Sequence, residues 1–355
     1  MDSALPTGRP ARFWKPSEKN GSVTCLACFR ACEIPEGRRG FCQSRANVNG
    51  MLYSLNYGYS ASLALDPIEK KPLYHFQPGS MTLSVGAPGC NLSCLGCQNH
   101  DLSRPGPNWP GAKFPPDIVS RLNQTAALND ADSWSFTYSE PTVFLEYAID
   151  LAAEAQLNGL PSVWVTNGSM SPEVLRALPP AVAAMNIDLK GFTEAFYREV
   201  TGGSLAAVKR NIELALSLGI WVEVTTLLIP GLNDSPAELN GLTAFLASLS
   251  PELPWHVSRF FPRHRQSHIQ ATPIPALEMA KGIGLDNGLR YVYVGNATKP
   301  GYGDTVCPSC RRTLIARTGY SIEKNDLGPD GVCPHCRAKI AGRWAPGLVA
   351  NDPPK

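Results

Sequence analysis

The chain has 355 residues, of which 43% are hydrophobic and 17% are charged. It is therefore globular rather than disordered, and long enough for one sizeable domain with one or two small ones. The balance of 32 basic against 30 acidic residues gives a net charge of +2, so no global field would attract nucleic acid or an anionic membrane. No apolar run approaches the roughly 18 residues of a membrane span, and residues 1–16 contain no stretch of signal-peptide length. We expect a soluble, cytoplasmic protein.

The chain divides into segments of different composition. Residues 1–22 are expected to form a flexible arm, and residues 23–80 a first module that carries four cysteines. A larger domain is expected over 81–298, a small module with four further cysteines over 299–345, and a tail over 346–355.

Short apolar segments alternate with amphipathic ones from residue 81 onward. The segments expected to be strands are 82–85, 134–138, 162–165, 185–189, 221–228 and 256–261. Helix-like stretches between them, such as 141–154 and 205–218, carry apolar residues at three- and four-residue spacing. Repeated strand–helix units predict a parallel sheet. The predicted fold class is α/β, with six such units forming an open, partial (β/α)6 barrel whose site lies at the carboxyl ends of the strands.

All eleven cysteines fall into three groups, and the middle group forms a CxxxCxxC loop directly after the first predicted strand: Cys90, Cys94 and Cys97. Three thiolates on one loop can hold three irons of a [4Fe-4S] cluster, whose usual complement is four cysteines. The fourth iron is then open, and it could accept the amino and carboxylate groups of a small molecule. A structural metal loop is the alternative.

The two outer groups have metal-ligand spacing, which indicates a reducing compartment rather than a disulfide framework. Cys307, Cys310, Cys333 and Cys336 form two CPxC pairs with 22 residues between them, a zinc-ribbon pattern in which His335 is a bystander. The first module carries Cys25, Cys28, Cys32 and Cys42. Their spacing is compatible with a closed zinc site or with a second four-iron cluster, and we slightly prefer zinc.

Polar residues follow several of the predicted strands. Glu140 opens a helix after the second strand, where an acid is favoured for structural reasons too, and Asn167 follows the third. Asp188 and Lys190 flank one apolar residue at the end of the fourth strand, so they point to the same side. Such a pair could bind a zwitterionic amino acid group, or it could be a solvated ion pair. The turn 229–234 predicts a helix cap at one of three positions: Asn233, Asp234 or Ser235.

Three weaker candidates lie elsewhere. His75 could face the site, but a loop histidine bonded to a backbone carbonyl is the preferred interpretation. His256 and Ser258 should share one face of the sixth strand and could touch a substrate if that face is the barrel interior. The cluster 263–265 is interpreted as a solvated loop, with docking of an acidic partner as the alternative.

Combined, these motifs resemble a known family. The cysteine loop with Gln98-Asn99, the Ser139-Glu140-Pro141 segment, the TNG and DLKG strand ends and the LLIPGLND turn resemble radical SAM (S-adenosylmethionine) enzymes related to pyruvate formate-lyase activating enzyme. The N-terminal cysteines, the DPIEKKPLYHF segment over 66–76, the YVYVGN segment and the two CPxC pairs are similar to the AmmeMemoRadiSam-system radical SAM proteins. The likeness covers residues 23–345.

The resemblance implies a partial radical SAM barrel in which Cys90, Cys94 and Cys97 hold the cluster and SAM chelates its free iron. It places Glu140 near the SAM amino group, and Asn167, Asp188 and Lys190 near the ribose and carboxylate; no catalytic residue beyond the cluster and SAM is implied. Two departures stand out. Gly96 occupies a position that is commonly aromatic, and Tyr138-Ser139-Glu140 replaces the usual Gly-Gly-Glu.

The implied function is that of a radical SAM enzyme, which reductively cleaves SAM to a 5′-deoxyadenosyl radical for hydrogen abstraction from a protein or peptide. A low-potential donor such as flavodoxin or ferredoxin would supply the electron, and neither a membrane nor a nucleic acid is an expected partner. The alternatives are a radical SAM enzyme for a small metabolite, or a non-catalytic metal- or nucleic-acid-binding protein.

Overall fold

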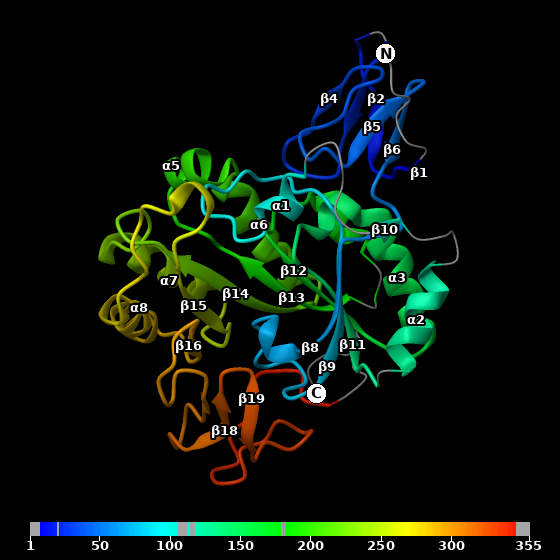
Figure 1. Cartoon of the computed structure of the whole chain (residues 1–355). Helices are drawn as coiled ribbons and strands as arrows, with labels where there is room; N and C mark the ends of the chain where they lie inside the picture. Colours follow the sequence, from blue (N-terminus) through cyan, green and yellow to red (C-terminus); the bar gives the residue numbers. More distant parts are fainter. Residues whose placement is uncertain are drawn as a thin grey trace.

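The computed structural model describes residues 8–19, 21–105, 112–113, 118–128, 130–178, 180 and 182–345. Its centre is an eight-stranded sheet with the strand order β16-β15-β14-β13-β12-β11-β9-β8 (Figure 1). The strands are β8 (Ser62–Pro67), β9 (Met81–Gly86), β11 (Ser133–Phe136), β12 (Ser162–Thr166), β13 (Val182–Asp188), β14 (Trp221–Leu228), β15 (Trp255–Arg259) and β16 (Val292–Gly295). Neighbours from β9 to β16 pair in parallel, and β8 pairs antiparallel with β9 at one edge.

The predicted α/β fold class is confirmed. All six predicted strands are present, as β9 and β11 to β15, and the sheet gains β16 and β8 at its two edges. The second predicted strand ends at Phe136, two residues earlier than expected. Tyr138 has a φ of 67°, in the left-handed region, and a residue in that conformation cannot continue a strand.

Helices connect the parallel strands. They are α2 (Ile118–Leu128), α3 (Leu145–Leu157), α4 (Pro172–Arg176), α6 (Leu205–Ser217), α7 (Pro236–Leu249) and α8 (Ile274–Asp286). The predicted helix over 141–154 begins as the 3-10 turn η2 (Pro141–Phe144) and continues as α3. Bulky apolar residues of the strands, including Trp134, Trp164 and Trp255, are fully buried in the main core.

Serine side chains begin several of these helices. Ser171, Ser204 and Ser235 each accept a hydrogen bond from a backbone N–H in the first turn of α4, α6 and α7, which satisfies a donor that has no partner within the helix. Of the three predicted caps after β14, Ser235 is therefore the cap. Asn233 instead donates to the carbonyls of Lys190 and Leu227, so it joins the ends of β13 and β14.

The N-terminal module lies at the carboxyl ends of the strands. It contains two small sheets formed by β1 (Arg9–Pro10), β2 (Trp14–Pro16), β3 (Val23–Cys25), β4 (Glu33–Ile34), β5 (Arg45–Val48) and β6 (Met51–Ser54). Cys28 forms a β-bridge with Met170, which follows β12, and Ser44 Oγ donates to the carbonyl of Pro88, which follows β9, at 2.8 Å. These contacts place the module over the carboxyl edge of the sheet.

A buried ion pair also joins this module to the barrel. The Arg45 guanidinium donates to both carboxylate oxygens of Glu146 in α3, at 3.1 and 2.9 Å, and both side chains are 2% exposed. Two parallel hydrogen bonds of this kind satisfy both charges and fix the relative orientation of the two groups.

The expected flexible arm differs from the structure in its described part. Residues 9–10 form β1, which pairs with β6, and residues 14–16 form β2, which pairs with β3. Ala11, which lies between the two strands in the sequence, is buried. The backbone of this segment is therefore held by sheet pairing, which the proline content did not suggest. Residues 1–7 of the arm and the tail expected at 346–355 lie outside the described residues.

The opposite end of the sheet is closed by residues 68–77, which begin with η1 (Ile68–Lys70), and by the C-terminal module. Ile68, Leu73 and Phe76 pack with apolar residues of β12 and β13. Backbone N–H groups of Tyr74 and His75 donate to Glu223, near the start of β14. The C-terminal module contains β17 (Thr305–Val306), β18 (Thr313–Thr318) and β19 (Ser321–Asn325). Figure 1 shows the two modules, blue and orange to red, on opposite sides of the central sheet.

No described helix combines the length and the hydropathy needed to cross a lipid bilayer.

Candidate functional site

The loop with Cys90, Cys94 and Cys97 follows β9 and leads to the short helix α1 (His100–Ser103). Backbone hydrogen bonds fix its path: Ser93 and Leu95 donate to carbonyls of η3 (Tyr197–Thr201), and Arg265 donates to the carbonyl of Leu95. Segments that follow β13 and β15 thus hold the loop at the carboxyl edge of the sheet. The chain itself positions the three thiols.

The spacing of the thiols differs between the cysteine groups. In the C-terminal group, the sulfurs of all four cysteines lie within 4.8 Å of one another. No other set of three or more His, Cys, Asp or Glu side chains among the described residues brings its ligand atoms so close together. The sulfurs of Cys307 and Cys336 are 3.6 Å apart, and those of Cys310 and Cys333 are 3.8 Å apart. Zn–S bonds of about 2.3 Å place tetrahedral sulfurs about 3.8 Å apart. The sulfur spacing of the C-terminal group therefore matches a tetrahedral site, whereas the three loop thiols do not all lie within 4.8 Å of one another.

Asn167, at the end of β12, lies against the loop. Its Nδ2 donates to Asn91 Oδ1 at 2.8 Å and lies 3.8 Å from Cys90 Sγ. An N–H directed at a ligating sulfur stabilises its negative charge, which is one means of tuning an iron–sulfur potential. Asn167 therefore connects the third strand end to the first cysteine.

Glu140 is 1% exposed and bonded to its neighbours. One carboxylate oxygen accepts from the backbone N–H and the hydroxyl of Thr142 and from the hydroxyl of Thr166, and the other accepts from the backbone N–H of Asn167 at 2.8 Å. In this structure Glu140 caps η2 and braces the ends of β11 and β12. A direct contact with a ligand stays a prediction.

Asp188 and Lys190 form the predicted pair at the end of β13. Lys190 Nζ lies 2.8 Å from Asp188 Oδ2, and both side chains are partly exposed. Burial lowers the pKa of Lys190, but the charges of Asp188 and, less strongly, Cys94 raise it, and the net shift is upward. Burial raises the pKa of the Cys94 thiol, and Lys190 counteracts this rise. The ion pair and the second cysteine therefore influence each other electrostatically.

The structure explains both departures from the family pattern. A Cβ added at Gly96 would lie 2.1 Å from Gln266 Oε1 and 3.3 Å from the Phe260 ring, so residues that follow β15 fill the space of a larger side chain. At Tyr138 the left-handed φ favours glycine, but the hydroxyl donates to Asp66 at 2.6 Å and the ring lies 4.8 Å from Lys71 Nζ. Asn99 Nδ2 donates to the Tyr138 carbonyl at 2.8 Å, which ties the cysteine loop to this turn.

Two of the weaker candidates, His75 and His256, lie near the amino ends of the strands. His75 is fully buried near the amino ends of the strands; its Nδ1 is 2.7 Å from the Ala341 carbonyl, as the carbonyl-bonded interpretation predicts. His256 bonds through Nε2 to Glu223 at 2.7 Å, in the same region. His335 lies 2.8 Å from Arg312 on the surface of the C-terminal module. Residues 263–265 are exposed, as expected for a solvated loop.

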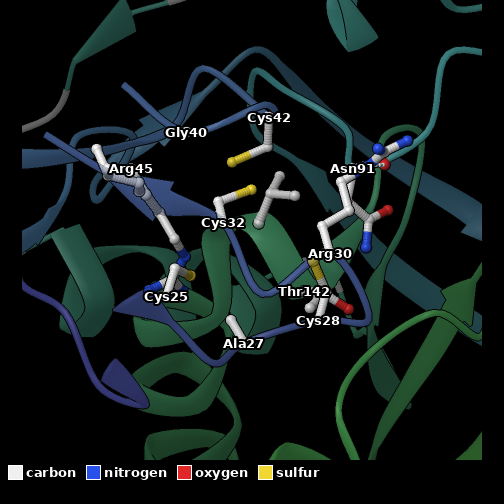
Figure 2. Close-up of a pocket in the computed structure, with 12 residues that line it drawn as sticks. Cys25, Ala27, Cys28, Arg30, Cys32, Gly40, Cys42, Arg45, Asn91 and Thr142 are labelled. Carbon is white, nitrogen blue, oxygen red and sulfur yellow. Dashed lines mark hydrogen bonds between the residues drawn. The ribbon is translucent and has the colours of Figure 1, made fainter. Parts of the chain in front are cut away.

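The four N-terminal cysteines line one pocket with residues that sequence reasoning missed. Arg30, Arg45 and Asn91 share this pocket with Cys25, Cys28, Cys32 and Cys42 (Figure 2). Arg104 was missed as well; it donates to the carbonyls of Phe41 and Leu92 at 2.7 Å and joins the module to the loop. The position of Asn91 directly after Cys90 was the available clue. No sequence pattern pointed to Arg30 or Arg45.

Comparison with known proteins agrees with this geometry. The sequence pattern of the radical SAM superfamily matches residues 84–239. The chain is 42% identical to an uncharacterized protein of Methanocaldococcus jannaschii over 87% of this chain and 91% of that protein. It is 29% identical to a probable GTP 3′,8-cyclase of Aeropyrum pernix over 41% of this chain, and spans only 42% of that enzyme.

Solved structures with related folds have low sequence identity. A domain of pyruvate-formate lyase-activating enzyme from Bacteroides vulgatus is 20% identical, with 46% of this chain and 98% of that chain covered and a TM-score of 0.41. A radical SAM methyltransferase from Sphaerobacter thermophilus is 13% identical, with 82% and 77% covered and a TM-score of 0.47.

Proposed function

We propose, on the premise that this chain belongs to the radical SAM superfamily and is a radical SAM enzyme, that Cys90, Cys94 and Cys97 bind its [4Fe-4S] cluster and that the substrate is a protein or peptide. The observation that carries the cluster assignment is the three-cysteine loop held at the carboxyl edge of the sheet by backbone hydrogen bonds to segments that follow β13 and β15. In this family the bound cluster and SAM supply reductive cleavage of SAM to a 5′-deoxyadenosyl radical.

The surrounding residues have distinct parts in this proposal. Lys190 and Asp188 present a cation and an anion next to Cys94, which suits the carboxylate and amino groups of SAM. The side-chain N–H of Asn167 points toward Cys90 Sγ. The backbone N–H of Asn167 donates to Glu140, and this hydrogen bond positions the residue. The N-terminal module covers the carboxyl edge and limits the access of water and oxidants to the site.

Incubation with dithionite and SAM under anaerobic conditions tests the assignment. Reconstituted wild type should form 5′-deoxyadenosine, and Cys94→Ala should reduce its formation at least about 100-fold, because the cluster loses one of three protein ligands. Cys336→Ala is the matched control, since its thiol belongs to the C-terminal group and its loss should leave the loop cluster in place. Undiminished cleavage in Cys94→Ala would refute the site.

An exposed segment next to the loop supports a polypeptide substrate. Phe261, Arg263, His264 and Arg265 are exposed after β15, and the Arg265 N–H is bonded to the loop at Leu95. An exposed aromatic ring beside two arginines suits an acidic polypeptide. Arg263→Glu combined with Arg265→Glu should weaken capture of the substrate protein and leave SAM cleavage without substrate intact. If the double variant captured the substrate protein normally and only its SAM cleavage changed, the substrate would not dock at residues 261–265.

A small metabolite is the second candidate, and the similarity to probable GTP 3′,8-cyclases favours it. Labelling distinguishes the two candidates. Deuterium from a deuterated co-purified protein should appear in 5′-deoxyadenosine if the substrate is a polypeptide, and deuterium from a labelled metabolite pool if it is small. The non-catalytic alternative does not agree with membership of this enzyme superfamily.

We propose the remaining assignments on the same basis. The motifs over 23–345 support membership of the AmmeMemoRadiSam-system group, with residues 23–80, 81–298 and 299–345 as its three units. The sulfur spacing of Cys307, Cys310, Cys333 and Cys336 supports structural zinc. Radical SAM enzymes need an electron donor, and a low-potential flavodoxin or ferredoxin is the proposed one.

A further inference from the structure

We propose that the pocket lined by Cys25, Cys28, Cys32 and Cys42 binds a second [4Fe-4S] cluster, and that this cluster passes electrons to the one on the Cys90 loop. The proposal reverses the preference for zinc that cysteine spacing alone suggested. It goes beyond the proposed function, because it adds a redox centre whose presence does not depend on SAM cleavage or on the substrate.

The spacing of the four thiols argues against a single ion. Within the described part of the chain, no three of them bring their sulfurs within 4.8 Å of one another, in contrast to the C-terminal group. The three loop thiols share this wider spacing. One cysteine group therefore has the close sulfur spacing of a mononuclear site, and in the other two groups the sulfurs do not all lie so close. A larger inorganic core holds its thiolates further apart than a single ion does.

The pocket also contains free space. Its volume is about 20 Å³, which exceeds the roughly 10–15 Å³ that one water needs. Figure 2 shows Cys25, Cys28, Cys32 and Cys42 arranged around this space.

Two buried donors that line the pocket need an acceptor. Arg45 Nε and Asn91 Nδ2 have no hydrogen-bond partner among the described residues, although Arg45 is 2% and Asn91 1% exposed. A buried unsatisfied donor is costly. The sulfide and thiolate sulfurs of a cluster are hydrogen-bond acceptors, and a group in this pocket would provide them. Arg30 also supplies positive charge to a group that carries four thiolates, whereas the charge of Arg45 is paired with Glu146.

A short path of contacts joins this pocket to the catalytic loop. Asn91 lines the pocket and directly follows Cys90. Its backbone carbonyl accepts from Arg30 Nε at 2.6 Å, and its Oδ1 accepts from Asn167, which lies 3.8 Å from Cys90 Sγ. Asn91 thus connects the lining of the pocket to the first loop cysteine. An electron from a ferredoxin or flavodoxin can pass through the N-terminal cluster to the loop cluster, each gaining and losing one electron with no bond change in the pocket.

Metal analysis of anaerobically reconstituted full-length protein tests the proposal. The expected content is about eight iron, eight sulfide and one zinc per chain. Cys28→Ser combined with Cys42→Ser should lose about four iron and keep the zinc. The triple change of Cys90, Cys94 and Cys97 to Ala should lose the other four. Cys307→Ser is the matched control and should lose zinc with all the iron retained.

A second measurement does not depend on folding of the variants. When both clusters of the wild type are reduced, their spins should couple and broaden the electron paramagnetic resonance spectrum beyond that of a single reduced cluster. About four iron and two zinc per chain in the wild type would overturn the proposal. So would full iron retention in the Cys28/Cys42 variant. Loss of SAM cleavage with eight iron retained would contradict the proposed function and leave the second cluster standing.

Discussion

At Gly89, one residue before the first loop cysteine, the chain passes very close to the N-terminal module. A Cβ added there would lie 2.0 Å from Ser44 Oγ and 2.8 Å from the backbone carbonyl of Cys42. The φ of +112° is also one that L side chains rarely adopt. Only glycine therefore permits this approach between the two cysteine-bearing segments.

Gly89→Ala should lower the free energy of unfolding by about 2–4 kcal/mol, from overlap and backbone strain together. Gly231→Ala is the matched control, because Gly231 also has positive φ but has nothing within 4 Å of the added carbon; it should cost only about 1 kcal/mol. Chemical denaturation measures both. Equal losses in the two variants would show that Gly89 is not in close contact with the module.

At this scale, sequence reasoning could select candidate residues by their chemical type and their position after a strand. Cys90, Cys94 and Cys97, like Asn167, Asp188 and Lys190, were placed at strand ends, because carboxyl ends of parallel strands meet at one edge. It could not identify residues that act through distant contacts. Gln266, which fills the space beside Gly96, and Arg45, which pairs with Glu146, depend on contacts between segments far apart in the chain.

At the scale of elements, the segment 68–77 shows how an irregular stretch can be rigid. His75 lies between the Ala341 carbonyl at Nδ1 and the Tyr293 hydroxyl at Nε2, 2.7 and 2.5 Å away. A neutral imidazole with its proton on Nδ1 satisfies both contacts. Burial lowers the pKa of His75 to about 4, so the folded protein keeps this ring neutral.

This linkage predicts a loss of stability in mild acid. The unfolded His75 takes up a proton near pH 6.5, whereas the folded one does so near pH 4. The stabilisation is therefore present above pH 6.5 and is lost as the pH falls toward 4, by about 3 kcal/mol in total. His75→Gln should be less stable at pH 7 and lose less between pH 6.5 and 4. Parallel pH curves for the two proteins would contradict this role.

The elements themselves were predictable where their hydrophobic pattern is local. The six parallel strands, the helix from 141 and the helix from 205 follow from apolar periodicity. The edge strand β8 was missed because it lies within the cysteine-bearing segment and becomes a strand only by pairing with β9. Likewise, β1 and β2 exist through pairing with β6 and β3, which no local pattern encodes.

At the scale of the whole molecule, the two cysteine-bearing modules have different positions relative to the sheet. The N-terminal module covers the carboxyl edge and contacts the loop that carries Cys90, Cys94 and Cys97. The C-terminal module closes the opposite end through residues 68–77: Arg317 donates to the Tyr74 carbonyl at 2.9 Å and Arg343 N–H to that of His75 at 2.7 Å. The first module is thus placed for a part in the chemistry, and the second for stabilising the fold.

Electron–nuclear double resonance on the reduced cluster with SAM labelled with ¹⁵N in its amino group is the most direct test of an open iron at the three-cysteine loop. Wild type should show a strong ¹⁵N coupling, because the amino group binds the iron that no cysteine occupies. The Cys90/Cys94/Cys97 triple variant should show none. Absence of the coupling in wild type that demonstrably binds SAM would mean that the fourth iron has a protein ligand, and the radical SAM site at this loop would be wrong.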